Sequence, residues 1–343
     1  ALESPFPAAN ILGMTMLHKA AAAPSEVAQL AEMREVVKAF VKTWLGHAEV
    51  SVGEKGGRVM GDLLDVDCEQ EPPARPQRRM AGHHPLDAGM PTWHDMVLRK
   101  EKGSGALWKR IFADEEIYGM VLDLLAGRHE DTDVTSADAG DEEGRKQKAR
   151  QLTLAQGRIL RILPRLAALD LEMLVRSEVR APEPGYYATA AATNGTSTNG
   201  HGNTRTNGTT GSRPNHHNGD ILMNGVEEEE EEQAQMPLPA PPRQGQGLLH
   251  FAALRMVDRN DILMHLSLID FFEAFVGLMR VTPHSEYKVE TVKEILREAL
   301  ADDKLLRENL ESLPDRTVDE EKEELRGWLR EVLPGEEVDV VMR

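Results

Sequence analysis

The chain has 343 residues, of which 40% are hydrophobic and only 4% aromatic, so it can bury a sizeable core but is poorly suited to a β-sandwich, whose strands favour aromatic and β-branched residues. Its 58 acidic residues outnumber its 40 lysines and arginines, which gives a formal net charge of −18. Such a field repels phosphate, so direct nucleic-acid binding is not expected.

The chain contains a single cysteine, Cys68. No disulfide or cysteine-based zinc cluster can therefore form within one chain, and a reducing compartment fits this composition. We expect a cytoplasmic location, with the nucleus as an open alternative. The first residues lack the charged, apolar and small-residue regions of a signal peptide, so secretion is not expected.

Helical pairs are predicted within a first block, residues 1–180. The three pairs cover residues 10–45, 107–125 and 153–175. Asn10, Asp114 and Asp170 stand where side chains can cap helix starts. Pro164 is expected to kink or break the helix that contains it.

Two segments of this block read as connections. Residues 46–105 are rich in glycine, proline, arginine and scattered histidine, which predicts a long surface-loop insertion. The glycines of that segment, Gly53, Gly56 and Gly57, lack the dinucleotide fingerprint and the P-loop ending, so they predict a flexible loop. Residues 129–150 are acidic and then basic, with almost no apolar content, and we expect a solvated connector.

Residues 181–246 form a low-complexity and acidic linker. It contains a tract of threonine, asparagine, glycine and histidine at 188–219 and the glutamate run Glu227–Glu232. Such a composition cannot bury enough apolar surface to offset chain entropy, so we expect disorder. The glutamate run could also steer a basic partner, although solvation explains it more simply.

A second helical block is predicted at residues 247–335, followed by a tail at 336–343. Its most apolar segment, residues 261–280, has apolar side chains at helical spacing: Ile262, Leu263, Leu266, Ile269, Phe272, Phe275, Val276 and Met279. His265, Asp270 and Glu273 interrupt this segment, so no membrane span is expected. Successive pairs recur at the period typical of HEAT and armadillo units, although no letter-for-letter repeat is present. The sequence therefore predicts an all-α, HEAT/armadillo-like α-solenoid of stacked helical pairs with long disordered insertions.

Two groups of histidines could carry chemistry. His83, His84 and His94 lie near Asp87 and Asp95, and imidazoles with carboxylates can bind zinc, but their spacing matches no familiar motif and solvated loop histidines are the simpler reading. His265 and Asp270 could act in acid–base work, yet residues five apart do not share a helical face. No nucleophile or phosphate loop accompanies them, so we predict no enzyme activity, no cofactor and no metal.

A local basic stretch is the best sequence candidate for binding an acidic protein partner. It comprises Arg158, Arg161, Arg165 and Arg176, with Arg180 beyond them. A solvated helix face is the alternative reading of the same residues. These arginines are predicted here as partner-binding residues.

Three stretches resemble a known family. They are LWKRIFADEEIYG at residues 107–119, TLAQGRILRILPRLA at 153–167 and GLLHFAALRMVD at 247–258. Together they resemble the fungal branch of the 26S proteasome non-ATPase regulatory subunit 5 family, which is also filed under a DNA mismatch-repair name. The resemblance implies that the chain folds as a curved HEAT-like solenoid. It also implies a role as a chaperone in assembly of the proteasome base, in which the solenoid holds the C-terminal domain of an ATPase subunit.

No individual contact residue is carried over from this family, because the three stretches are packing patterns and not catalytic signatures. The alternative function is a protein-interaction scaffold or adaptor in DNA mismatch repair. Both readings predict a protein partner, and neither predicts direct contact with nucleic acid or membrane.

Overall fold

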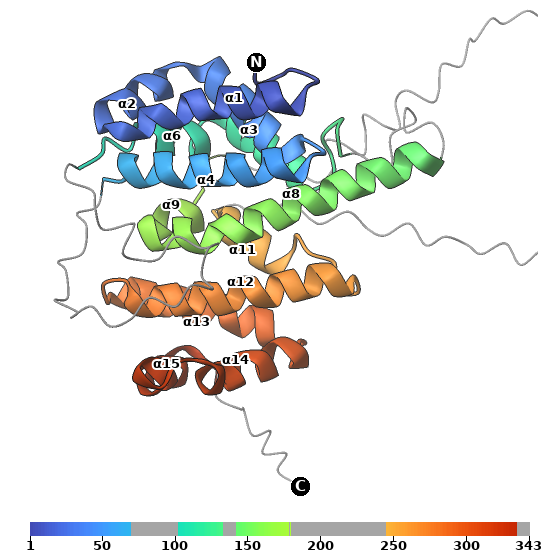
Figure 1. Cartoon of the computed structure of the whole chain (residues 1–343). Coiled ribbons are helices and arrows are strands. Elements are labelled where there is room, and N and C mark those ends of the chain that lie inside the picture. Colours follow the sequence, from blue (N-terminus) through green and yellow to red (C-terminus); the bar gives the residue numbers. More distant parts are fainter. Residues whose placement is uncertain (70–101, 133–141, 178, 180–244, 335–343) are drawn as a thin grey trace, which may run out of the picture. The chain divides into compact units, whose positions relative to one another are not determined.

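The computed structural model describes residues 1–69, 102–132, 142–177, 179 and 245–334. In these ranges the chain forms 13 α-helices and one short 3-10 helix, and it contains no strand (Figure 1). The predicted all-α class is therefore confirmed for the described part of the chain.

The N-terminal helices are α1 (Pro7–His18), the 3-10 helix η1 (Lys19–Ala22), α2 (Pro24–Glu32), α3 (Arg34–Gly46), α4 (Val50–Asp67), α6 (Ala106–Phe112) and α7 (Glu115–Leu125). Two of them, α1 and α2, begin at prolines, and α7 is capped by an aspartate. Proline suits a first helical position because the missing N–H would have no partner there. Asn10, predicted as a cap, instead lies buried within α1, where its side chain donates to the carbonyl of Leu2. Asp114 caps α7 as predicted.

Helix α4 corrects the loop predicted at residues 46–105. It is an 18-residue helix whose buried side chains recur at helical spacing: Val52, Val59, Met60, Leu63 and Leu64. Its glycines were misleading, because in this helix they allow close approach of neighbouring side chains and do not mark a loop. Residues 70–101, the rest of the predicted insertion, lie outside the described residues.

Helix α8 (Glu142–Leu169) corrects the connector predicted at residues 142–150 and excludes a break at Pro164, whereas a kink there stays a prediction; a short helix, α9 (Leu171–Val175), follows it. Residues 142–150, expected to be part of a solvated connector, form the first turns of α8. Glutamate, arginine, lysine, glutamine and alanine are all good helix formers, so these turns need no apolar face. The helix also continues through Pro164, which is buried within it. Buried apolar residues on both sides of Pro164 offset the cost of its missing N–H, about 3 kcal/mol.

The C-terminal helices agree closely with the predicted pairs. They are α11 (Leu248–Leu254), α12 (Ile262–Val281), α13 (Glu286–Leu300), α14 (Lys304–Arg316) and α15 (Asp319–Val332). The side chains of Asp261, Ser285 and Asp303 accept hydrogen bonds from the first N–H groups of α12, α13 and α14. Helix α15 begins at Asp319 without a side-chain cap.

Helix α12 is the central apolar helix, and its buried face differs in part from the predicted one. Phe272 and Phe275 are fully buried, whereas Ile262 and Leu263 in the first turn are 73% and 74% exposed. Leu266, also predicted to be buried, is 49% exposed. The helix is long and apolar enough to cross a membrane by those two criteria alone, but its phenylalanine face packs in the protein core.

The described helices pack in a consistent order. Helix α1 contacts α4, α4 contacts α8, α8 contacts α12, and α12 contacts α14 and α15 (Figure 1). The helices of both predicted blocks belong to one compact unit, residues 1–183 and 239–343. Residues 184–238, which make up most of the predicted linker, lie outside the described residues, as does the 336–343 tail.

Candidate functional site

The predicted partner-binding arginines lie on α8, where two of them pack against glycines of α4. A Cβ atom added at Gly53 would lie 1.9 Å from Nε of Arg158. A Cβ atom at Gly61 would lie 2.5 Å from Nη1 of Arg165. The glycines therefore leave room for arginine side chains to pass between the two helices. We call this contact the α4–α8 seam and define it by these four residues.

Arg158 closes the end of α3. Its Nη1 donates to the carbonyls of Trp44 and Leu45 at 3.0 and 2.8 Å, and its Nη2 donates to the carbonyl of Glu49 at 3.0 Å. The last carbonyls of a helix have no partner within the helix and carry partial negative charge, so a cation stabilises them. Burial lowers the pKa of Arg158 to about 10. Arg158 is therefore part of the internal structure and not a free partner-binding group.

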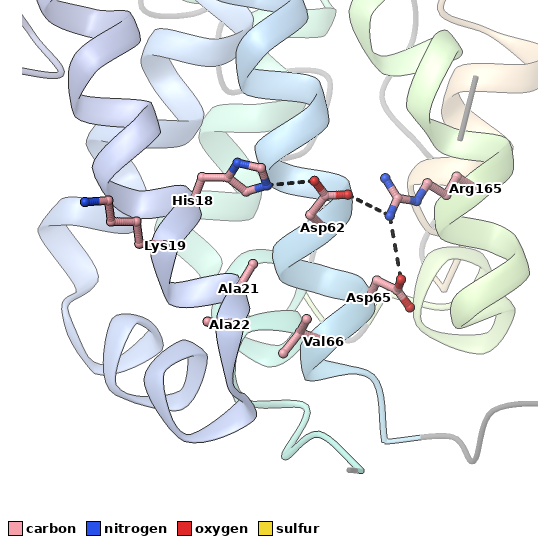
Figure 2. Close-up of a pocket in the computed structure, with 8 residues that line it drawn as sticks. All are labelled: His18, Lys19, Ala21, Ala22, Asp62, Asp65, Val66 and Arg165. Carbon is pink, nitrogen blue, oxygen red and sulfur yellow. Dashed lines mark hydrogen bonds and ion pairs between the residues drawn. The ribbon is translucent and has the colours of Figure 1, made fainter. Parts of the chain in front are cut away.

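Arg165 lines the pocket drawn in Figure 2, which has a volume of about 420 Å³. Its Nη2 lies 2.9 Å from Oδ1 of Asp62 and 3.7 Å from Oδ2 of Asp65. Asp62 also bonds to Nε2 of His18 at 2.7 Å, so the network joins α1, α4 and α8. The lining residues are His18, Lys19, Ala21, Ala22, Asp62, Asp65, Val66 and Arg165.

This pocket has the parts of an ion network and not those of a nucleophilic site. No serine, threonine or cysteine side chain is among its lining residues. Asp62 is shared between His18 and Arg165, so its two oxygens are already engaged on opposite sides. We interpret the arrangement as a brace that fixes the first helix to α4 and α8.

The other two predicted arginines are exposed. Arg161 has a 72% exposed side chain and lies 3.3 Å from the Glu54 carboxylate. Arg176 is 63% exposed, pairs with Glu172 at 2.8 Å and places its guanidinium 5.1 Å from the ring centroid of Tyr287. The four arginines therefore do not form one free surface, and a partner role for Arg161 and Arg176 stays a prediction. Arg180 lies outside the described residues.

His265 is bound to an aspartate that the sequence pattern did not indicate. Its Nε2 lies 2.8 Å from Oδ2 of Asp303, and Arg259 lies 3.5 Å from the same oxygen. The other oxygen of Asp303 accepts from the N–H of Leu306 and caps α14. Asp270, the partner considered from sequence, is exposed on the same helix. The pair joins two helices, and His265 and Asp303 are 38 positions apart in sequence, which explains why local spacing could not reveal the contact.

One described cluster could hold a metal ion. Potential ligand atoms of His129, Glu130 and Asp131 lie within 4.8 Å of one another. The ammonium group of Lys42 lies 3.2 Å from Glu130 and 3.7 Å from Asp131, so both carboxylates already share one protein cation. The histidines considered for zinc from sequence, His83, His84 and His94, lie outside the described residues.

Two buried charged groups that sequence reasoning missed also close helix ends. Asp67 is fully buried and accepts hydrogen bonds from the N–H groups of Leu107 and Trp108, at the start of α6. Lys288 donates to the carbonyls of Met279 and Thr282 at 2.9 Å, at the end of α12, and burial lowers its pKa. Such long-range caps satisfy backbone groups that would otherwise be buried without partners. Only the tertiary structure reveals them.

No family model, curated protein or solved structure matches this chain.

Proposed function

We propose that this protein is a non-enzymatic scaffold that binds another folded protein, and that its helical pairs stack in a HEAT/armadillo-like manner. The observation that carries this proposal is the packing order, in which each layer of helices contacts the next along the chain. Stacks of this kind build extended surfaces suited to folded partners. The strongest candidates for chemistry, Arg158, Arg165 and His265, support this view because each is engaged in joining helices.

The proposed partner is the C-terminal domain of a proteasomal ATPase subunit, and the proposed role is that of an assembly chaperone for the proteasome base. The resemblance of residues 107–119, 153–167 and 247–258 supports this choice. These stretches contribute to α6 and α7, to α8 and to α11, and in the structure α6 contacts α7 while α8 contacts both α7 and α11. The side chain of Gln156 ties this region together by donating to the carbonyls of Leu125 and Met256, both at 3.0 Å.

The proposed mechanism is steric. The scaffold holds one ATPase domain, slows its premature docking and leaves when the complete particle competes for the same face. Reversible release requires a largely polar interface, because large apolar interfaces are typical of permanent complexes.

Affinity capture from fungal lysate tests this proposal. The chain is used as bait, bound proteins are eluted at moderate salt, and they are identified by mass spectrometry. Enrichment of proteasomal ATPase subunits without the core particle is the expected result. Enrichment of mismatch-repair proteins without proteasome subunits would replace the proposal by the adaptor alternative.

A further inference from the structure

The start of α8 extends beyond the ends of its neighbours (Figure 1). In these turns, residues 142–150, no side chain is buried. We call this segment the α8 arm. Its charged residues are Glu142, Glu143, Arg145, Lys146, Lys148 and Arg150. Four cations against two anions make the arm positive, whereas the whole chain has a net charge of −18.

Most of this positive charge is not neutralised within the described part of the chain. Lys146 lies 2.5 Å from Glu142. Arg145, Lys148 and Arg150 have no ion pair with any described residue. Cations near a helix start oppose the helix dipole, so favourable interaction with the dipole does not account for their presence. These three cations therefore lie on a part of α8 without buried side chains, since the buried residues of the helix begin at Ala155.

An exposed apolar group lies at the start of α12, the helix that packs against α8, and in Figure 1 the two helices start on the same side of the molecule. It is the first turn of α12, with Ile262, Leu263 and Leu266. The connection into α12 is fixed to α8 because Gln156 donates to the carbonyl of Met256 at 3.0 Å. Gln156 follows Arg150 by six positions, which is about 9 Å of helix. This contact therefore holds the chain segment that leads into α12 about two helical turns along α8 from Arg150.

We propose that the α8 arm and the first turn of α12 together bind an acidic amphipathic helix of a protein partner. Carboxylates of that helix pair with the arm, and its apolar face covers the exposed turn. We call this the arm surface, and it comprises Arg145, Lys148, Arg150, Ile262, Leu263 and Leu266. The proposal rests on the proposed function and names the chemistry of the client segment that the scaffold recognises.

Charge complementarity selects a short acidic protein segment over an extended polyanion. A nucleic-acid duplex or an anionic membrane would continue past the arm into the negative field of the rest of the chain. An acidic helix of about 15 residues, about 22 Å long, ends within the reach of the arm and the adjacent turn. The exposed side chains of Ile262, Leu263 and Leu266 are apolar and cannot donate hydrogen bonds to phosphate.

The test uses the full chain and a labelled peptide helix of about 15 residues, with leucines at helical spacing on one face and glutamates on the other. Fluorescence anisotropy reports its binding to the natural chain and to a triple variant with Arg145→Glu, Lys148→Glu and Arg150→Glu. The matched control reverses Arg58, Arg297 and Arg330, three exposed cations on α4, α13 and α15. Both triples change the net charge equally. We expect the arm triple to weaken binding about tenfold or more, and the control triple to change it less than about twofold.

Several results would overturn the proposal. They are no binding to the natural chain, equal loss in both triples, and tighter binding of a DNA duplex or of anionic vesicles than of the peptide. A chain lacking residues 188–244 that binds the peptide about tenfold more tightly would assign the arm surface to the chain's own glutamate run and overturn a partner role.

The same variants separate this inference from the proposed function. Peptide binding without binding of any ATPase domain would remove the proposed client and leave the arm surface in place. An ATPase domain that binds the natural chain and the arm triple equally well would support the proposed function and overturn the arm surface as its docking site.

Discussion

Replacing Gly53 by alanine tests the α4–α8 seam, because the new Cβ atom would lie 1.9 Å from Nε of Arg158. The arginine tip would have to move, although it is held by three backbone carbonyls. Losing one charge-assisted hydrogen bond costs about 1.5–3 kcal/mol, while alanine in place of a mid-helix glycine gains about 0.5–1 kcal/mol. We expect Gly53→Ala to lower the free energy of unfolding by about 1–2 kcal/mol.

Gly57→Ala is the matched control on the same helix. Its Cβ atom would meet Nε1 of Trp44 at 3.5 Å, an ordinary contact, so only the helix-propensity gain remains. We expect this variant to be more stable than the natural protein by about 0.5–1 kcal/mol. Urea unfolding followed by circular dichroism measures both variants.

A double-mutant cycle with Arg158→Ala measures the coupling free energy between positions 53 and 158. Once the arginine side chain is gone, the space beside Gly53 is open, and Gly53→Ala should become stabilising like Gly57→Ala. The account of the seam would be refuted if Gly53→Ala were as well tolerated as Gly57→Ala in the natural chain. It would also be refuted if the cost of Gly53→Ala were unchanged without Arg158.

Three further predictions concern the rest of the unit. The Arg34 guanidinium holds the pKa of Asp114 well below its usual 3.8. The Asp114 carboxylate therefore stabilises the fold above about pH 4, and this contribution is lost as the pH falls further. Asp114→Asn should lower the melting temperature at about pH 7, and thermal scans should show that the difference shrinks toward about pH 2. Phe272 is fully buried, and Phe272→Asp should abolish the cooperative thermal transition because a buried unpaired carboxylate costs several kcal/mol. Leu263→Asp, on the exposed first turn of α12, should leave the melting curve nearly unchanged, and equal effects of the two variants would show that the buried face is wrongly placed. Deletion of residues 188–244 should leave the melting curve intact. The two ends of the structure on either side of the deleted segment are already joined, because the backbone nitrogen of Gly247 donates to the carbonyl of Val175 at 2.7 Å. Loss of the cooperative transition would contradict this prediction.

Local sequence signals predicted most of the helices because those signals act within a few residues. Asp114 and Asp170 cap the helices whose starts they mark, and Ile269, Phe272 and Phe275 lie on the buried side of α12. These features depend on backbone geometry and helical spacing alone. They therefore predict element type and part of the core without knowledge of the neighbours.

The misplaced features depend on contacts between distant residues. Gly53 predicts a loop from sequence, but Arg158, which fills the space beside it, lies on another helix about 100 positions later. Ile262 and Leu263 fit the apolar period of α12, yet their side chains are mostly exposed. Helical spacing shows which residues share a face and does not show how much of that face a neighbour reaches.

The candidate site was the least predictable part for the same reason. Arg158 and Arg165 have the composition of a basic patch, but carbonyls and carboxylates of other helices engage them. The cations of the α8 arm were read as a solvated connector, and only the structure places them on a helix that extends beyond its neighbours. The sequence shows which residues are charged, whereas their availability to a partner depends on how the helices pack around them.

Binding of purified components tests the central proposal most directly. The full chain is mixed in turn with the C-terminal domain of each proteasomal ATPase subunit, and the mixtures are analysed by size-exclusion chromatography and native mass spectrometry. The account predicts that one domain forms a stoichiometric complex that higher salt dissociates. Failure of every domain to bind, with the natural chain folded by circular dichroism, would contradict it.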